Sequence, residues 1–347
     1  MKRIITVLVL IFLLAVPVSA LEYTAPTVPD SGQALMPPEQ ESFGKDLWKI
    51  LRDAMESFFP EIAKNAGLCV ALIGVVILIS VLKELPGKSL KTAQLAGTLI
   101  ISLLMMQETG SCIHKAAETV KEMSEYGKLL IPVMAASLAA QGGVTTSGSM
   151  YAATAIFDTV LTTGISKLLL PLMYMFLALC VASSAIGESV LKSLRDLIKW
   201  VITWGLKIAL YLFTGYIGIT GVISGTTDAA ALKAAKITIS SVVPVVGGIL
   251  SDASEAVLVS AGVMKNAAGI YGILAIIAVF VTPFLQIGVQ YLMLKVTAAV
   301  SKVFGIKQLS ELIQDFSGAM GLLLGMTGSV CLMLLISTIC FMKGVGL

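Results

Sequence analysis

Two carboxylates in an apolar stretch are the residues of this sequence best suited to chemistry. The stretch SSVVPVVGGILSDASEAVLVSAGVMKN contains, in order, Pro244, Gly247, Gly248, Asp252 and Glu255. Proline lacks an amide proton and glycine adopts conformations closed to other residues, so together they can end a helix. We therefore predict a backbone break here, followed by a second half-helix that begins at Asp252.

The two acids have a structural and a functional interpretation. As caps, Asp252 accepts hydrogen bonds from the free amides of the new helix, and Glu255 occupies the third helical position of a capping box. As a functional pair, they face an aqueous path or coordinate a cation or a proton, because ionisable groups within membrane regions are costly and often functional. The sequence alone leaves both interpretations open.

Other polar residues offer less chemistry. Gln286 and Gln290 are four residues apart on one apolar segment, so we expect them to form hydrogen bonds between helices. Asp158 stands in a second broken apolar stretch without a companion acid, so a symmetric ion site is not indicated. The five cysteines and the single histidine have no metal or redox spacing. We find no nucleophile with a base and no phosphate loop, so we assign no catalytic, cofactor or metal residue and expect no enzyme.

The composition requires a membrane. Hydrophobic residues make up 57% of the 347 residues, charged residues only 13%, and the mean hydropathy is +0.94. Globular domains carry about 25% charged residues, and a water-soluble fold of this size could not bury so much apolar surface. Basic residues are spread singly, which excludes a nucleic-acid footprint. We predict an all-α integral membrane protein that contacts the lipid bilayer and binds no nucleic acid.

The first 64 residues divide into three segments. Residues 1–20 have the charged start, apolar centre and small-residue end of a signal peptide. Residues 21–42 are rich in proline and poor in large apolar groups, which predicts an exported flexible linker. Residues 43–64 predict an amphipathic helix at the outer interface, which Pro60 should end or kink. The remainder, 65–347, is predicted to be a polytopic membrane domain.

The amphipathic helix carries one apolar stripe. Leu47, Leu51 and Phe58 recur at helical spacing, and Trp48 lies beside them. Because the segment is exported and leads directly into a membrane span, we expect this stripe to be buried on lipid or on an exported partner.

Six segments are apolar enough to span a bilayer. They are residues 66–82, 92–107, 168–187, 200–222, 267–294 and 317–342. The links 83–91, 188–199 and 295–316 carry more lysine and arginine than acid. The positive-inside rule places all three in the cytoplasm, in agreement with the signal peptide.

Two regions do not fit simple spans. Residues 129–166 and 237–264 each consist of two short apolar pieces joined by small or polar residues. We interpret them as re-entrant hairpins of half-helices, or as pairs of crossing helices that raise the total to eight to ten spans. The same interval separates Pro132 from Pro244 and Pro171 from Pro283. A parallel internal repeat explains this spacing, and coincidence is the alternative.

Residues 205–272, from GLKIALYLFTGYIG to KNAAGIYG, resemble the stage III sporulation protein AE family of endospore-forming bacteria. The signal peptide, exported linker and polytopic remainder are similar too, so the resemblance covers nearly the whole chain. It implies a multi-pass protein of the mother-cell membrane around the forespore, within a channel between the two cells that sustains late forespore gene expression. The implied partners are ring-forming proteins and an ATPase of the same operon, and a protein of the forespore membrane.

The resemblance leaves the physical role open. A polytopic subunit with broken hairpins can be the translocating or permease-like part of such a channel. The alternatives are a non-conducting scaffold for the ring proteins and a stand-alone secondary transporter. The family supplies no catalytic or binding residue to carry over, and the cargo, copy number and energy source do not follow from the sequence.

Overall fold

The computed structural model describes residues 26–38, 42–83, 90–242 and 247–343. The elements are α2 (Asp30–Gln33), α3 (Phe43–Lys83), α4 (Leu90–Ala140), α5 (Val144–Gly164), the π-turn η1 (Ile165–Leu169), α6 (Leu170–Ile186), α7 (Ser189–Val242), α8 (Gly247–Val303) and α9 (Lys307–Lys343). All regular structure in the described residues is helical, which confirms the all-α prediction.

Among the described residues, six helical segments are long and apolar enough to cross a membrane, as the sequence predicts. They are Asn65–Lys83, Lys91–Ala140, Val144–Ile186, Ser189–Thr220, Lys265–Val303 and Lys307–Lys343. Most are much longer than a bilayer requires. The 51 residues of α4, for example, extend about 77 Å at 1.5 Å per residue, against a hydrocarbon core of about 30 Å. Each long helix therefore has a large part outside the lipid.

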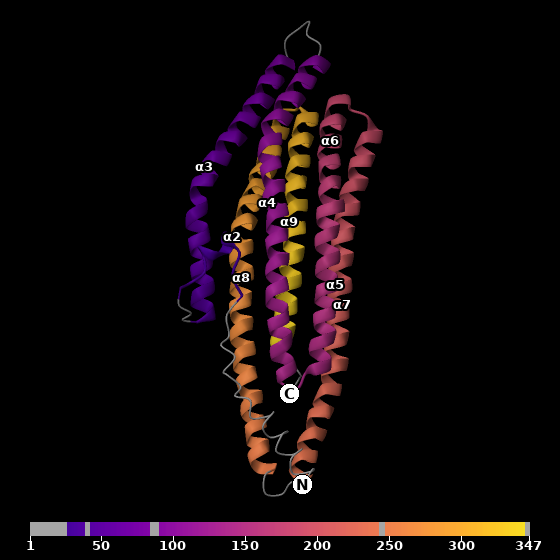
Figure 1. Cartoon of the computed structure of the whole chain (residues 1–347). Coiled ribbons are helices and arrows are strands. Elements are labelled where there is room, and N and C mark those ends of the chain that lie inside the picture. Colours follow the sequence, from indigo (N-terminus) through magenta and orange to yellow (C-terminus); the bar gives the residue numbers. More distant parts are fainter. Residues whose placement is uncertain (1–25, 39–41, 84–89, 243–246, 344–347) are drawn as a thin grey trace.

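The long helices form antiparallel hairpins that turn at the same end of an elongated bundle (Figure 1). The end of α3 meets the start of α4 there, as α6 meets α7 and α8 meets α9. The three basic links of the sequence therefore belong to one end of the molecule, as the positive-inside rule requires.

The centre of the bundle is formed by α4, α8 and α9, with α3 on one side and the α5–α7 pair on the other (Figure 1). The core between these helices is apolar and closely packed. Its central residues include a set that is at most 1% exposed: Leu130, Met134, Ile287, Leu294, Leu312, Phe316, Met320, Leu323, Met326 and Val330. Hydrophobic burial against α8 and α9 therefore holds the remaining helices in place.

The first predicted hairpin exists in a different form. The chain turns at residues 141–143, where Gly142 has a φ of +91° that glycine adopts at no steric cost. Its two arms are the ends of α4 and α5, which continue without a break into the flanking spans. They are not separate half-helices that re-enter the membrane, because Pro132 lies inside α4 and does not interrupt it.

The second predicted hairpin begins its return helix earlier than expected. The structure starts α8 at Gly247, so the prediction of a start at Asp252 is wrong. Glycine is tolerated at a helix N-terminus, and the apolar residues that follow extend the helix there. Pro244 lies outside the described residues, as do the side chains of Asp252 and Glu255. The structure therefore tests neither the capping role nor the functional role of these two acids.

The π-turn η1 has a local cause in Pro171. A proline has no amide proton to donate to the carbonyl four residues before it, here that of Lys167, and its ring crowds that carbonyl. Widening the helix over Ile165–Leu169 relieves this conflict without breaking the long segment from α5 to α6.

The predicted repeat has support only in the shared direction of the hairpins. The similar segments LRDL (194–197) and IKQL (306–309) are separated by the same interval as the two proline pairs. They occupy different places, because the first lies inside α7 and the second lies at the start of α9. The three hairpins nevertheless run in one orientation, as units of two helices must.

The described part of the predicted flexible linker is packed on the bundle. Gly32 in α2 is buried, and a Cβ atom there would lie 2.7 Å from Cγ2 of Val279 in α8. Val28 and Met36 pack against the same core. The prediction of a flexible linker over 21–42 is therefore wrong for residues 26–38, because the few apolar groups among the prolines find a complementary surface on α8.

The amphipathic segment also packs within the chain. Ile50 and Ala54, at most 1% exposed, form a cluster with Leu274 and Ala278 of α8, and Leu47 and Leu51 flank it. The prediction that lipid or an exported partner covers this stripe is wrong, since α8 covers it. Phe58 is buried, whereas Trp48 points away and is 70% exposed. The helix also continues through Pro60 to Lys83 and bends along its length (Figure 1).

Candidate functional site

A polar stripe follows the exposed side of α4. Between Gln107 and Lys128, every fully exposed residue is polar: Gln107, Ser111, His114, Glu118, Lys121, Glu125 and Lys128. The steps alternate between four and three residues, which keeps the side chains on one face of the helix. Lysines and glutamates are equal in number, and Lys121 pairs with Glu125 at 3.8 Å. This side of the bundle is suited to water or to a polar partner and not to lipid.

Hydrogen bonds anchor one flank of this stripe to α2 and α8. Lys115 Nζ donates to Oε1 of Gln286 at 2.8 Å, and Ser31 donates to Glu122. The groups line a cavity of about 440 Å³ between α2, α4 and α8. Gln286 therefore accepts a hydrogen bond from another helix, as we expected from its position in the sequence. Gln290 is buried, with 5% of its surface exposed.

The amphipathic part of α3 adds to the polar side. Its exposed residues include Lys45, Lys49, Arg52 and Glu56, and Arg52 bonds Glu56 at 2.8 Å. Because Ile50 and Ala54 contact α8 beside the part of α8 that faces α4, the polar faces of α3 and α4 lie at a similar depth.

The opposite side of the bundle is apolar. Along the described part of α7, the large exposed side chains include Trp200, Trp204, Ile208, Tyr211, Leu212, Tyr216 and Ile219. Trp200 and Trp204 contact each other with ring centroids 6.1 Å apart, and Lys207 lies 5.9 Å from the Trp204 ring. Aromatic and aliphatic groups of this kind are suited to acyl chains and their interface.

Two contacts fix the depth of these opposite sides. Ser124 of α4 donates to Oδ2 of Asp158 in α5 at 2.6 Å. Phe157, which precedes Asp158 in α5, packs edge to face against Phe213 of α7, with ring centroids 5.5 Å apart. Ser124 and Phe213 are therefore level, so the polar stripe of α4 and the apolar face of α7 occupy the same depth. At this depth the bundle is two-sided, which means that it exposes polar residues on the α4 side and apolar residues on the α7 side.

Nearer the end with the basic links, the side formed by α3 and α4 becomes apolar. There α3 and α4 expose Val70, Leu78, Val81, Leu95, Leu99, Leu103 and Met106. Thr98, at this depth, bonds Ser184, which in turn donates to the carbonyl of Gln308. The residues beside Gln308 belong to a charged cavity of about 570 Å³, which includes Lys192, Arg195, Lys302, Lys307, Glu311 and Asp315. Its pairs include Lys192–Glu311 at 2.9 Å and Arg195–Asp315.

The apolar surface of α3 and α4 is confined to the end with the basic links, whereas that of α7 continues to the depth of the polar stripe. Met106 is separated from Ser124 by about 27 Å along α4, nearly the thickness of a hydrocarbon core. One flat bilayer around a single chain cannot cover the apolar face of α7 beside Phe213 and leave the polar stripe of α4 in water.

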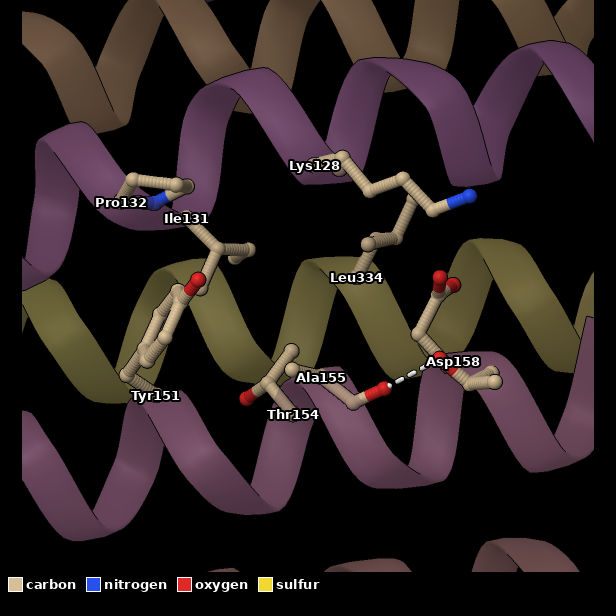
Figure 2. Close-up of a pocket in the computed structure, with 10 residues that line it drawn as sticks. Lys128, Ile131, Pro132, Tyr151, Thr154, Ala155, Asp158 and Leu334 are labelled. Atoms are coloured by element: carbon tan, nitrogen blue, oxygen red, sulfur yellow. Dashed lines mark hydrogen bonds between the residues drawn. The ribbon is translucent and has the colours of Figure 1, made fainter.

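A small pocket lies between α4 and α5 at the edge of the polar stripe (Figure 2). It has a volume of about 90 Å³, and Pro132 and Tyr151 line it together with Lys128 and Asp158. The carboxylate of Asp158 points from α5 toward α4, and the side chain of Lys128 lies on the same side (Figure 2). Asp158 is 5% exposed. Sequence reasoning missed this site because the partner of Asp158, Ser124, lies on another helix.

The described residues hold no group of three histidine, cysteine or acidic side chains that could bind a metal. The five cysteines are free, and Cys112, Cys180 and Cys331 are buried. The polar and apolar sides described above, together with the Asp158 pocket, are the features most relevant to function.

Comparison with known proteins agrees with these features of a multi-pass membrane protein. Over 272 residues the chain is 24% identical to stage III sporulation protein AE of Bacillus subtilis (strain 168), covering 76% of this chain and 67% of that protein. No solved structure matches. The family model for stage III sporulation protein AE matches residues 33–346. This match spans almost the whole chain, which therefore belongs to the stage III sporulation protein AE family.

Proposed function

We propose that this protein is a membrane-embedded subunit of the sporulation channel between mother cell and forespore, with one side toward lipid and the other toward an aqueous path or a polar partner. In this proposal it lies in the mother-cell membrane around the forespore and catalyses no reaction. The ring-forming proteins and the ATPase of the same operon, and a forespore membrane protein, are its proposed partners.

The observation that carries the proposal is the two-sided bundle. A protein that worked alone in lipid would expose apolar residues all round at one depth. Here Glu118, Lys121 and Glu125 of α4 are exposed at the depth where α7 exposes Ile208 and Leu212. Such a surface is stable in a membrane only if other subunits or a water-filled space adjoin the polar side.

The packed core favours assembly over independent transport. The centre between α4, α8 and α9 is filled by buried apolar side chains such as Ile287, Phe316 and Leu323. A water path therefore has to run along the outside of this chain, between it and its neighbours. The proposal expects no conductance from the purified chain in liposomes, and ion-dependent solute uptake by the chain alone would favour a stand-alone transporter instead.

A non-conducting scaffold is the second candidate, because the same polar side can serve as a docking face. The charge balance of the stripe separates the two. Changing Glu118→Gln together with Lys121→Gln keeps size and hydrogen bonding but removes two charges. If the stripe lines an aqueous path, this double change is expected to lower late forespore gene expression. If the stripe is a docking face recognised by its shape, gene expression is expected to stay normal.

Adding bulk to the polar side tests the proposal. Ser111→Trp is expected to lower late forespore gene expression by about tenfold, as a loss of ~1.4 kcal/mol in assembly or passage would do. The exposed position leaves the fold intact, so protein abundance should not change. A transcriptional reporter in the forespore and an immunoblot of the membrane fraction measure the two effects.

Val201→Trp is the matched control, because Val201 is exposed on α7 at nearly the depth of Ser111, where lipid accommodates a large side chain. Normal reporter activity in Ser111→Trp, or an equal loss in both variants, would contradict the proposed orientation of the two sides.

A further inference from the structure

We propose that Asp158 and Thr162 of α5 form a binding site for a monovalent metal cation, reached from the polar side of the bundle. The site lies one helical turn before the π-turn η1, and Asp158 lines the pocket shown in Figure 2. It is independent of the proposed function, because it concerns binding to the isolated chain.

Two buried oxygen atoms one turn apart point to a ligand. Oδ1 of Asp158 and Oγ1 of Thr162 are shielded from solvent, and neither has a hydrogen-bond partner among the described residues. Residues four apart lie on the same face of a helix, with Cβ atoms about 5–6 Å apart. Because buried polar atoms are almost always satisfied, two such atoms on one face indicate a shared ligand between them.

The charge of Asp158 favours a cation over a water molecule. Its Oδ2 accepts one hydrogen bond, from Ser124, and the side chain is 5% exposed. One hydroxyl does not neutralise a buried carboxylate, which ordinarily requires a counter-charge. Lys128 is the basic residue that lines the pocket, and its charge acts on Asp158, but its side chain is exposed and makes no direct ion-pair contact with the carboxylate. A bound water satisfies the oxygen atoms but not the charge.

The ligand set selects the class of cation. It consists of one carboxylate and neutral oxygen atoms, and Thr154 and Thr159 place further hydroxyl groups along the pocket. Zinc usually takes histidine or cysteine ligands, and calcium usually takes several carboxylates. No such group occurs among the described residues. A single negative charge with hydroxyl and carbonyl oxygen fits Na⁺ or K⁺, and the pocket of about 90 Å³ leaves room for bound water.

The test is the thermal unfolding of the purified full chain in detergent, in equimolar LiCl, NaCl, KCl or N-methylglucamine chloride. We expect one of the metal salts to raise Tm on the order of 2 °C for each tenfold increase above its Kd, and N-methylglucamine to have no such effect. Asp158→Asn keeps the shape and removes the charge, so it is expected to abolish the metal-specific shift.

Thr162→Val provides a second variant in case Asp158→Asn does not fold, and it should weaken the response several-fold. Glu118→Gln removes an exposed acid from α4 and should leave the response unchanged. Lys128→Met removes a nearby positive charge and should strengthen it.

Three results would overturn the proposal. One is a wild-type protein that responds equally to all four salts, which leaves only a buried water. Another is a metal-specific response that appears in Lys128→Met but not in the wild type, because Lys128 is then the counter-ion. The third is a wild-type response that survives both Asp158→Asn and Thr162→Val.

Discussion

Gly272→Leu is expected to separate α4 from α8 and to remove most of the folded protein. A Cβ atom at Gly272 would lie 2.6 Å from Cδ2 and 2.8 Å from Cδ1 of Leu130. Leu130 is fully buried, so its side chain has no room to rotate away. Overpacking typically costs about 1–3 kcal/mol, and a whole leucine side chain at a helix contact lies at or above the top of that range.

The measurement is the Tm of the purified protein together with its abundance in membranes. Gly288→Leu is the matched control on the same helix, because nothing lies within 4 Å of a Cβ atom there. Leu130→Ala combined with Gly272→Ala should recover part of the loss through the space it creates. Equal Tm values for Gly272→Leu and Gly288→Leu would show that α4 and α8 do not pack as described.

Arg195→Met is expected to lower stability by about 2 kcal/mol, since it leaves Asp315 without its cation. The two side chains are 14% and 19% exposed, so the cost should fall below that of a fully buried pair. Exchanging the charges, with Arg195→Asp and Asp315→Arg, should restore much of the loss, because the ion pair between α7 and α9 re-forms.

Arg52→Met serves as the control for this pair. It breaks an exposed pair with Glu56 within one helix, whose side chains are 67% and 59% exposed, and should leave the free energy of unfolding unchanged. Chemical denaturation in mild detergent measures both effects. A charge exchange that destabilises as much as Arg195→Met alone would show that the contact between α7 and α9 does not depend on this pair.

The six apolar segments could be predicted because the signal is local. Fifteen to twenty consecutive apolar residues identify a span whatever surrounds them, and links such as 83–91 carry their orientation in their own charges. The extent of each helix was harder to predict. Proline and glycine near 129–166 and at Pro60 suggested breaks, but neighbouring helices hold α3 and α4 continuous through Pro60 and Pro132. Tertiary packing outweighs a local preference of a few kcal/mol.

The partners of amphipathic faces could not be predicted from the sequence. The stripe around Leu47 and Leu51 predicted burial but could not reveal that α8, more than 200 residues later, covers it. The same limit applies to Gly32, whose contact with Val279 makes part of a proline-rich segment ordered. Such pairs depend on which helices become neighbours, and that information is not local.

The candidate site was missed for a related reason. Interest in Asp252 and Glu255 came from two acids close together in sequence, whereas the pocket around Asp158 is built from two helices and an unpaired oxygen atom. The polar stripe was present in the sequence as alternating steps of four and three residues from Gln107. Its meaning depends on the apolar face of α7 at the same depth, which only the contacts between Phe157 and Phe213 establish.

The most direct test of the two-sided bundle is the water accessibility of single cysteines in an otherwise cysteine-free protein, in membranes of sporulating cells. The polar side is sampled by Ser111→Cys, His114→Cys and Glu118→Cys, and the apolar side by Ile208→Cys, Tyr211→Cys and Leu212→Cys. A small charged thiol reagent should modify the three α4 positions and leave the three α7 positions unmodified. Equal modification of both sets, or modification of α7 alone, would contradict the account.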